Sequence, residues 1–184
     1  MSHRLLFGFL VCTLVACAKS VPDYQPDIQA GIQIHELATQ AHGATYFTMS
    51  GQSRPVFSVQ ASPSGQVVLY VLSQRHDEIG SKEPFQVLCS TAKLVVGNET
   101  FAPLKPTGQT TNQSDTWRIA SCSDEATING EDKLIGVLLQ FESNKPFNDT
   151  FSLVLPQVDL GSGPIEQRRM TFSKRLLKEA WGIR

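Results

Sequence analysis

The stretch LIGVLLQFE, from Leu134 to Glu142, is the most apolar run in the body of this chain. It includes the β-branched residues Ile135 and Val137 and the aromatic Phe141, which are residue types enriched in strands. A short, continuous apolar run of this kind is typical of a strand that lies inside a fold. We therefore predict that 134–142 is the central strand of a sheet.

Shorter strand patterns lie on both sides of this run. Phe151, Leu153 and Leu155 recur at every second position, as residues on one face of a strand do. Ser62-Pro63-Ser64-Gly65 has the composition of a turn, and Gly97-Asn98 suits a tight hairpin. The other predicted strands are Tyr46–Met49, Pro55–Gln60, Gln66–Ser73, Phe85–Val96 as one strand or two, Glu99–Leu104, Ser114–Ser121 and Arg169–Ser173.

Helix signals are confined to two segments. Residues 28–40 fit a strand through Ile32 and Ile34, or a short helix over 34–40. Residues 173–181 resemble a short helix that ends at Gly182. We predict an all-β fold, a loosely immunoglobulin-like β-sandwich with a short C-terminal helix at about 173–181. The likeness to immunoglobulin domains is architectural, because Trp117 stands just before the second cysteine of the body rather than after the first.

The N-terminus has the pattern of a signal peptide. Arg4 supplies a positive charge, and residues 5–15 are almost entirely apolar. This apolar stretch is shorter than the about 20 residues that a membrane-spanning helix needs. We therefore predict that residues 1–16 are a signal peptide that is removed.

The end of this signal, Leu14-Val15-Ala16-Cys17, resembles the lipobox of bacterial lipoproteins. The resemblance covers only about the first 20 residues and assigns a class, without a specific family. It implies that the Cys17 thiol receives diacylglycerol and that cleavage leaves Cys17 as an acylated N-terminus, with palmitate-type chains holding the protein to a membrane. The competing possibility is ordinary secretion, with cleavage after Ala18.

The lipobox also bears on location and domain organisation. Ala18, and not Asp, follows Cys17, which implies transport to the outer membrane in envelopes that use Asp there as a retention signal. Residues 17–27 contain two prolines and few apolar residues, which predicts a lipidated N-terminus and linker. Residues 28–184 would then form a single β-sandwich domain, including its C-terminal helix.

The cysteines agree with export from the cytoplasm. Cys12 would leave with the signal and Cys17 would be acylated, so Cys89 and Cys122 remain as the only pair. In an oxidising compartment this pair is expected to form a disulfide. A redox-active or metal-binding pair would usually be closer in sequence.

Composition and motifs exclude several classes of function. The formal net charge of −1 argues against a nucleic-acid binder. His35 and His42 lack a third ligand at zinc spacing, and the acidic residues 124–132 lack the calcium-loop pattern. Gly161-Ser162-Gly163 lacks the strand-to-helix setting of a nucleophile elbow. We therefore predict a protein that is not an enzyme, with no catalytic residues, metal ligands or cofactor.

The most asymmetric part of the chain is its C-terminal end. Residues 167–184 hold six basic side chains and one acidic side chain, Glu179. Leu177 and Trp181 would share one face of the predicted helix, while Lys174 and Lys178 would share another. This helix would either pack on its own sandwich or dock a partner. The candidate partner-contact residues are Lys174, Arg175, Leu177, Lys178 and Trp181.

Together these patterns predict a lipid-anchored protein of the bacterial outer membrane. Its partners would be the lipid bilayer, through acylated Cys17, and another envelope protein bound by the sandwich in assembly, secretion or adhesion. One alternative is a periplasmic module that binds a small molecule or a glycan. A second alternative is a glycan hydrolase, whose paired carboxylates would meet only in the fold.

Overall fold

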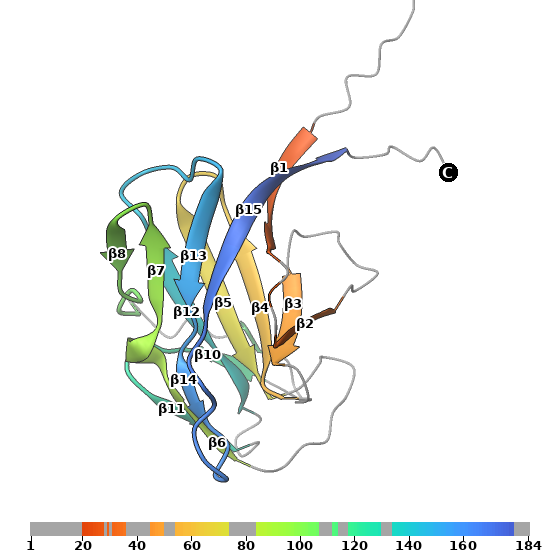
Figure 1. The fold of residues 1–184 in the computed structure, drawn as a ribbon. Coiled ribbons are helices and arrows are strands. Elements are labelled where there is room, and N and C mark those ends of the chain that lie inside the picture. Colours follow the sequence, from red (N-terminus) through yellow and green to blue (C-terminus); the bar gives the residue numbers. More distant parts are fainter. Residues whose placement is uncertain are drawn as a thin grey trace, which may run out of the picture.

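The computed structural model describes residues 20–27, 29, 31–35, 45–49, 54–73, 84–106, 112–113, 118–129 and 134–178. These residues form β-strands and a short 3-10 helix, so the predicted all-β fold is confirmed. Figure 1 shows strands in two layers that face each other. The predicted β-sandwich is therefore confirmed as well, and large apolar side chains fill the space between its layers.

The described strands form three sheets. The first has the order β1-β15-β13-β7-β8, with bounds Ser20–Pro26, Arg169–Lys178, Thr150–Val154, Lys93–Val96 and Glu99–Phe101. The second has the order β2-β3-β4-β5-β12-β10-β9, with bounds Ile32–His35, Thr45–Met49, Val56–Ala61, Gln66–Leu72, Leu134–Glu142, Arg118–Ser121 and Asn112–Gln113. The third has the order β11-β6-β14, with bounds Ala126–Ile128, Phe85–Leu88 and Gln157–Asp159.

Two strands of the third sheet are neighbours in sequence of two strands of the first: β6 precedes β7, and β14 follows β13. Helix η2 (Cys89–Thr91) divides the predicted strand at 85–96 into β6 and β7, and Leu155-Pro156 separates β13 from β14. Thr91 joins the two interruptions, because its hydroxyl donates to the Leu88 carbonyl at 2.6 Å and accepts from the Gln157 amide at 2.8 Å.

The run at 134–142 is strand β12, as predicted, and it lies inside the second sheet between β5 and β10. Val137, Leu139 and Phe141 point into the main core. Leu138 belongs to a second buried cluster, together with Leu72 of β5. Because successive side chains of a strand face opposite sides of the sheet, both faces of β12 are covered at its centre, which explains why the run is continuously apolar.

The predicted turns are present. Gly97-Asn98 joins β7 to β8 with Gly97 at φ 59°, and Ser62–Gly65 joins β4 to β5. Gly65 has φ 102°, and a Cβ on it would lie 2.6 Å from the Lys145 carbonyl oxygen. Only glycine fits this position, because both the backbone angle and the close approach exclude a side chain. In the ambiguous segment, Ile32–His35 is strand β2.

The predicted C-terminal helix is wrong for the residues that can be described. Ser173–Lys178 belongs to strand β15, while 179–184 lie outside the described residues. Met170 and Phe172 are buried on one face, and β15 pairs with β1 on one side and β13 on the other. These ladder bonds come from distant parts of the chain and outweigh a weak local helix preference.

The linker predicted at 17–27 also needs correction. Ser20–Pro26 forms strand β1, which pairs with β15 from Ser20↔Lys178 to Pro26↔Phe172. Tyr24 is buried against Phe147 and Phe151, with ring centroids 5.6 and 5.4 Å away. A polar, proline-containing segment can form an edge strand when one buried aromatic side chain fastens it to the core.

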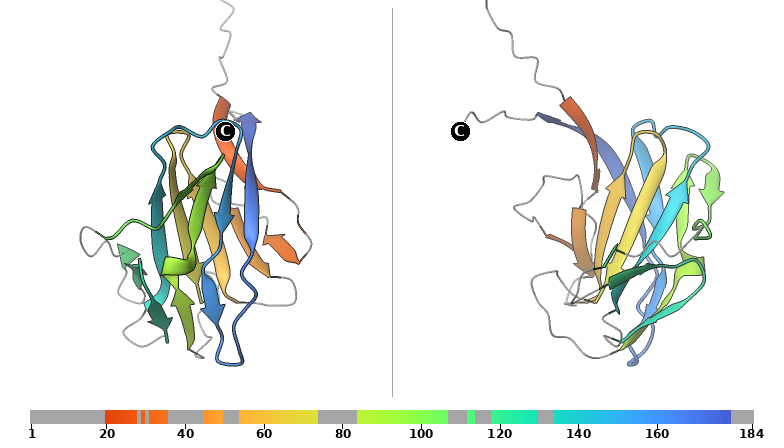
Figure 2. Two further views of the ribbon diagram at one scale, coloured as in Figure 1. Left: turned by 60° about the vertical axis from the view of Figure 1, so that its left-hand side comes forward. Right: turned by 180° about the vertical axis from the view of Figure 1, so that it is seen from behind.

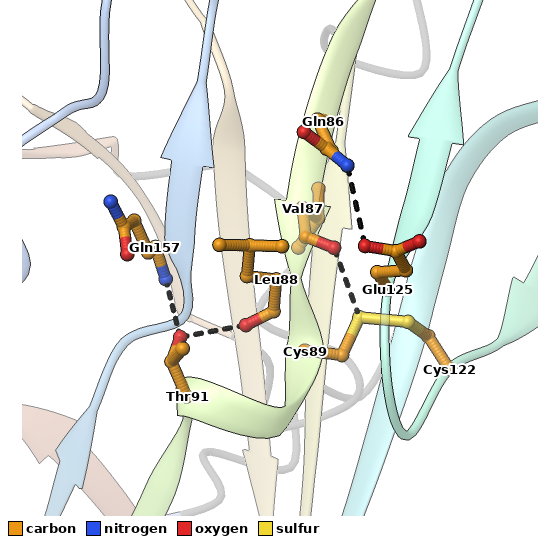
Figure 3. Close-up of a disulfide and its surroundings, with 8 residues drawn as sticks. All are labelled: Gln86, Val87, Leu88, Cys89, Thr91, Cys122, Glu125 and Gln157. Carbon is orange, nitrogen blue, oxygen red and sulfur yellow. Dashed lines mark hydrogen bonds between the residues drawn. A yellow bond between two sulfur atoms is a disulfide. The ribbon is translucent and has the colours of Figure 1, made fainter.

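The predicted disulfide between Cys89 and Cys122 is present. Figure 3 shows it beside the turn of η2, where β6 ends. Cys122 directly follows β10 of the second sheet, and its amide donates to the Leu138 carbonyl at 2.9 Å. The bond therefore links the two layers of the sandwich, and both cysteines are buried.

Candidate interaction site at the ribbon end of the sandwich

Strands β1 and β15 leave the body of the sandwich together. Figures 1 and 2 show this pair reaching beyond the neighbouring strands at one end of the molecule. We call the paired segments Ser20–Tyr24 and Lys174–Lys178 the ribbon, and the end from which it projects the ribbon end. Four residue steps of about 3.3 Å give the ribbon a length of about 13 Å.

One edge of the ribbon lacks a neighbouring strand within the described part of the chain. Pairing of β15 with β13 ends at Ser173↔Thr150, and the Lys174 amide then donates to the Asp149 carbonyl at 2.7 Å. Beyond Lys174, β15 pairs with β1 alone. Residues 175–178 of β15 therefore have a strand on one side only.

The hydrogen bonds define which backbone groups face this open side. On the β1 side, the Thr171 carbonyl accepts a hydrogen bond from the Asp27 amide. On the β13 side, the Arg168 carbonyl accepts from the Leu155 amide, and the Lys174 amide donates to the Asp149 carbonyl. Backbone groups alternate between the two sides along a strand. The amide and carbonyl groups of Leu176 and Lys178 accordingly face the open side, which we call the docking edge.

The opposite edge, on β1, carries two prolines, Pro22 within the ribbon and Pro26 beyond it. Since Asp27 bonds to β15, the backbone groups of Pro22, Tyr24 and Pro26 face away from β15 by the same alternation. Proline has no N–H, so Pro22 and Pro26 cost no bond to β15 and remove two donors from the outer edge of β1. Strand addition is thereby disfavoured at β1, and the docking edge of β15 stays available.

The predicted partner-contact residues fall on this ribbon, with Trp181 outside the described residues. Lys174 and Arg175 are exposed. Leu177 and Lys178 are paired through the backbone with Val21 and Ser20. Because this segment is a strand, the helical face predicted through Leu177 is not formed. Cys17, predicted to be acylated, also lies outside the described residues, three positions before β1 begins.

A groove of about 590 Å³ lies at the ribbon end, between the β7–β8 hairpin and the β12–β13 connection. Figure 1 shows this connection passing over the end of the sandwich. We call it the end groove; its lining residues are Val96, Gly97, Asn98, Glu99, Phe101, Ser143, Lys145, Pro146 and Asn148. Sequence reasoning found the hairpin but missed the groove, because its two walls are more than 40 positions apart in the chain.

The β12–β13 wall of the groove is held firmly. Phe147 is buried, with its ring stacked on that of Phe151 at 4.6 Å. Its amide donates to the Pro63 carbonyl at 3.2 Å, and the Ser143 amide donates to the Gly65 carbonyl at 2.9 Å. The neighbours Pro146 and Asn148 are therefore presented to the groove from an anchored loop.

An ion pair connects the two walls. Lys145 of the β12–β13 connection pairs with Glu99 at the start of β8. Their side chains are 68% and 47% exposed, so the pair contributes little to stability. Close to this loop, burial raises the pKa of Tyr24, and the Asp149 carboxylate raises it further. The Tyr24 hydroxyl, which donates to the Phe147 carbonyl, is thus neutral near pH 7.

Other candidate chemistry is not assembled in the described residues. No three His, Cys, Asp or Glu side chains among them lie close enough to hold a metal ion. Asp124 and Glu125 are exposed, and Glu125 accepts a bond from Gln86 at 3.4 Å. Gly161 and Gly163 lie in the connection after β14, with no helix following within the described residues.

Comparison with known proteins adds no relative. No protein-family model, curated protein or solved structure matches this chain. In the part of the chain that the structure describes, no helix is long and apolar enough to cross a membrane.

Proposed function

We propose that this chain is a lipid-anchored protein of the bacterial outer membrane whose β-sandwich docks another envelope protein. The anchor is the acylated Cys17 of the Leu14–Cys17 lipobox. The protein would act in assembly, secretion or adhesion by binding this partner, and not by catalysis.

The short distance from Cys17 to the fold supports a close tether. Only Ala18 and Lys19 separate Cys17 from Ser20 of β1. Three residue steps span at most about 11 Å, so an acylated Cys17 would hold the ribbon next to the bilayer. The ribbon, rather than a flexible linker, would then set the distance between the membrane and the sandwich.

The docking edge of β15 is the main support for a protein partner. An exposed strand edge can accept an extended segment of another chain, which gains backbone hydrogen bonds. The adjacent Lys174 and Arg175 are exposed and favour a segment with acidic side chains.

Pairing between two copies of this chain at the same edge is disfavoured. In an antiparallel pair centred on Leu176, Lys174 of one copy would stand opposite Lys178 of the other. Like charges directly opposite each other destabilise a sheet. The favoured occupant is therefore an extended acidic segment of a different protein.

The anchor is tested by metabolic labelling with a fatty-acid analogue. The wild-type protein is expected to carry the label and the Cys17→Ser variant to lack it, because only the thiol accepts the diacylglycerol. Equal labelling of the two proteins, or labelling of neither, would show that Cys17 is not the tether. This result would leave the docking edge untouched.

The docking edge is tested with a matched pair of proline variants. Leu176→Pro removes an N–H that faces the open side, while Ser20→Pro removes one from the opposite edge of the ribbon; neither removes a β1–β15 bond. Cross-linking in membranes is expected to join the same envelope protein to the wild type and to Ser20→Pro. The yield should fall at least about tenfold for Leu176→Pro, as expected for the loss of one or two hydrogen bonds. An unchanged yield for Leu176→Pro would refute docking at this edge.

A further inference from the structure

The end groove presents both hydrogen-bond donors and acceptors from two facing walls. Asn98 lies in the hairpin wall and Asn148 in the loop wall, and both are exposed. Each amide has a carbonyl acceptor and an NH₂ donor, while Lys145 donates and Glu99 accepts. A ligand that matches this set must itself offer donors and acceptors at neighbouring positions, as the hydroxyl groups of a sugar ring do.

The charge of the groove favours a neutral ligand. Among the described lining residues, Lys145 is the only cationic side chain and Glu99 the only anionic one, and they form an ion pair. The lining therefore has no net charge with which to attract an anion or a cation. An anionic ligand would have to share Lys145 with Glu99 and would be repelled by that carboxylate.

The remaining lining is apolar. Val96 and Phe101 are half-buried and pack against the main core, and Pro146 is exposed beside them. Apolar side chains with a small number of polar groups are typical of small-molecule sites, and the volume of about 590 Å³ lies in their usual range. Such a surface suits the C–H face of a sugar ring, whose hydroxyls point outward to the polar groups.

From this combination we propose that the end groove binds a neutral carbohydrate. A peptide is less favoured, because β8 is only three residues long and offers few backbone groups to an added strand. The site is separate from the docking edge and does not depend on acylation of Cys17. The site is also preorganised, because the packing of Phe147 and the β7–β8 pairing fix both walls of the groove in the absence of a ligand.

The test is an NMR titration of the full chain, labelled with ¹⁵N, with neutral oligosaccharides of glucose and of N-acetylglucosamine. Oligosaccharide concentrations of about 10 mM detect millimolar affinity. At least one of the two oligosaccharides is expected to shift the backbone amide resonances of Asn98, Glu99, Phe101 and Asn148 together. Sulfated forms of the same sugars and a neutral peptide rich in Ser and Asn are the comparison ligands.

Asn148→Ala and Asn144→Ala form the matched variants. Both asparagines are exposed in the same connection, but only Asn148 lines the groove. Asn148→Ala is expected to weaken binding about tenfold, and Asn144→Ala to leave it unchanged. The proposal is overturned if no neutral sugar shifts these amides, if the sulfated sugars or the peptide bind more tightly, or if the two variants behave alike.

Discussion

Gly136 shows how one missing side chain positions a buried strand. It lies in β12 opposite Leu72 of β5. A Cβ at this position would lie 2.6 Å from the Leu72 Cδ2 atom and 2.7 Å from the Val71 carbonyl oxygen. The side chain of Leu72 therefore occupies the space that any larger residue at 136 would need. The close approach lets Leu72 join Val56, Ile119 and Leu138 in the second buried cluster.

The substitution Gly136→Ala is expected to destabilise the domain by about 1–3 kcal/mol, the usual cost of overpacking. Denaturant unfolding measures this cost. The penalty should be smaller in a Leu72→Ala background, because Leu72 Cδ2 is then absent, but it should not vanish, because the Val71 carbonyl remains. A Gly136→Ala protein as stable as the wild type would contradict the packing described here.

At the scale of elements, the ribbon is the part of the sandwich that reaches beyond the neighbouring strands. β15 forms hydrogen bonds with β13 in its first half and keeps β1 as its partner along its second half. Pro22 and Pro26 remove N–H donors from the outer edge of β1, whereas Lys174 and Arg175 lie in β15 beside its open edge. Lysine on a strand edge opposes self-association, and it also attracts partners of opposite charge. These features underlie our proposal that the ribbon binds an acidic segment of another protein rather than a second copy of this chain.

A synthetic peptide of alternating Glu and Val tests this charge preference directly. It is expected to bind the wild-type protein more tightly than a peptide of alternating Lys and Val, with an association rate that falls as salt is added. The double variant Lys174→Glu/Arg175→Glu should reverse the order of the two peptides. Lys105→Glu, an exposed change at a residue outside the ribbon segments, should preserve this order. Equal binding of both peptides to the wild type would contradict the proposed partner chemistry.

At the scale of the whole molecule, two features stabilise the sandwich at different places. An aromatic series of Tyr24, Phe147, Phe151 and Phe172 fills the core near the ribbon. The Cys89–Cys122 disulfide connects the layers where η2 interrupts the first layer. The core therefore supports the end that carries the candidate sites, and the covalent link constrains the strands around the interruption.

Removing the disulfide is expected to lower the free energy of unfolding by about 3–4 kcal/mol, since it closes a loop with a sequence separation of 33 residues. The melting temperature of the Cys89→Ser/Cys122→Ser protein should fall by about 10 °C. Reductant should destabilise the wild type to a similar extent and leave the double variant unchanged. Two titratable thiols at these positions in the denatured, unreduced protein would contradict the link.

The sequence alone determined the all-β class, the strand at 134–142, the turns at Ser62–Gly65 and Gly97-Asn98, and the pairing of Cys89 with Cys122. The fold features follow from local patterns, and the cysteine pairing followed from the prediction that Cys12 is removed and Cys17 acylated. Tertiary structure decided that Ser20–Pro26 and Ser173–Lys178 are strands, and it brought residues 96–101 and 143–148 together as a groove. A helix closes its hydrogen bonds within one segment, whereas a strand needs the backbone of another. Along the ribbon, the partner of β15 is β1, about 150 positions away, and a local pattern does not contain it.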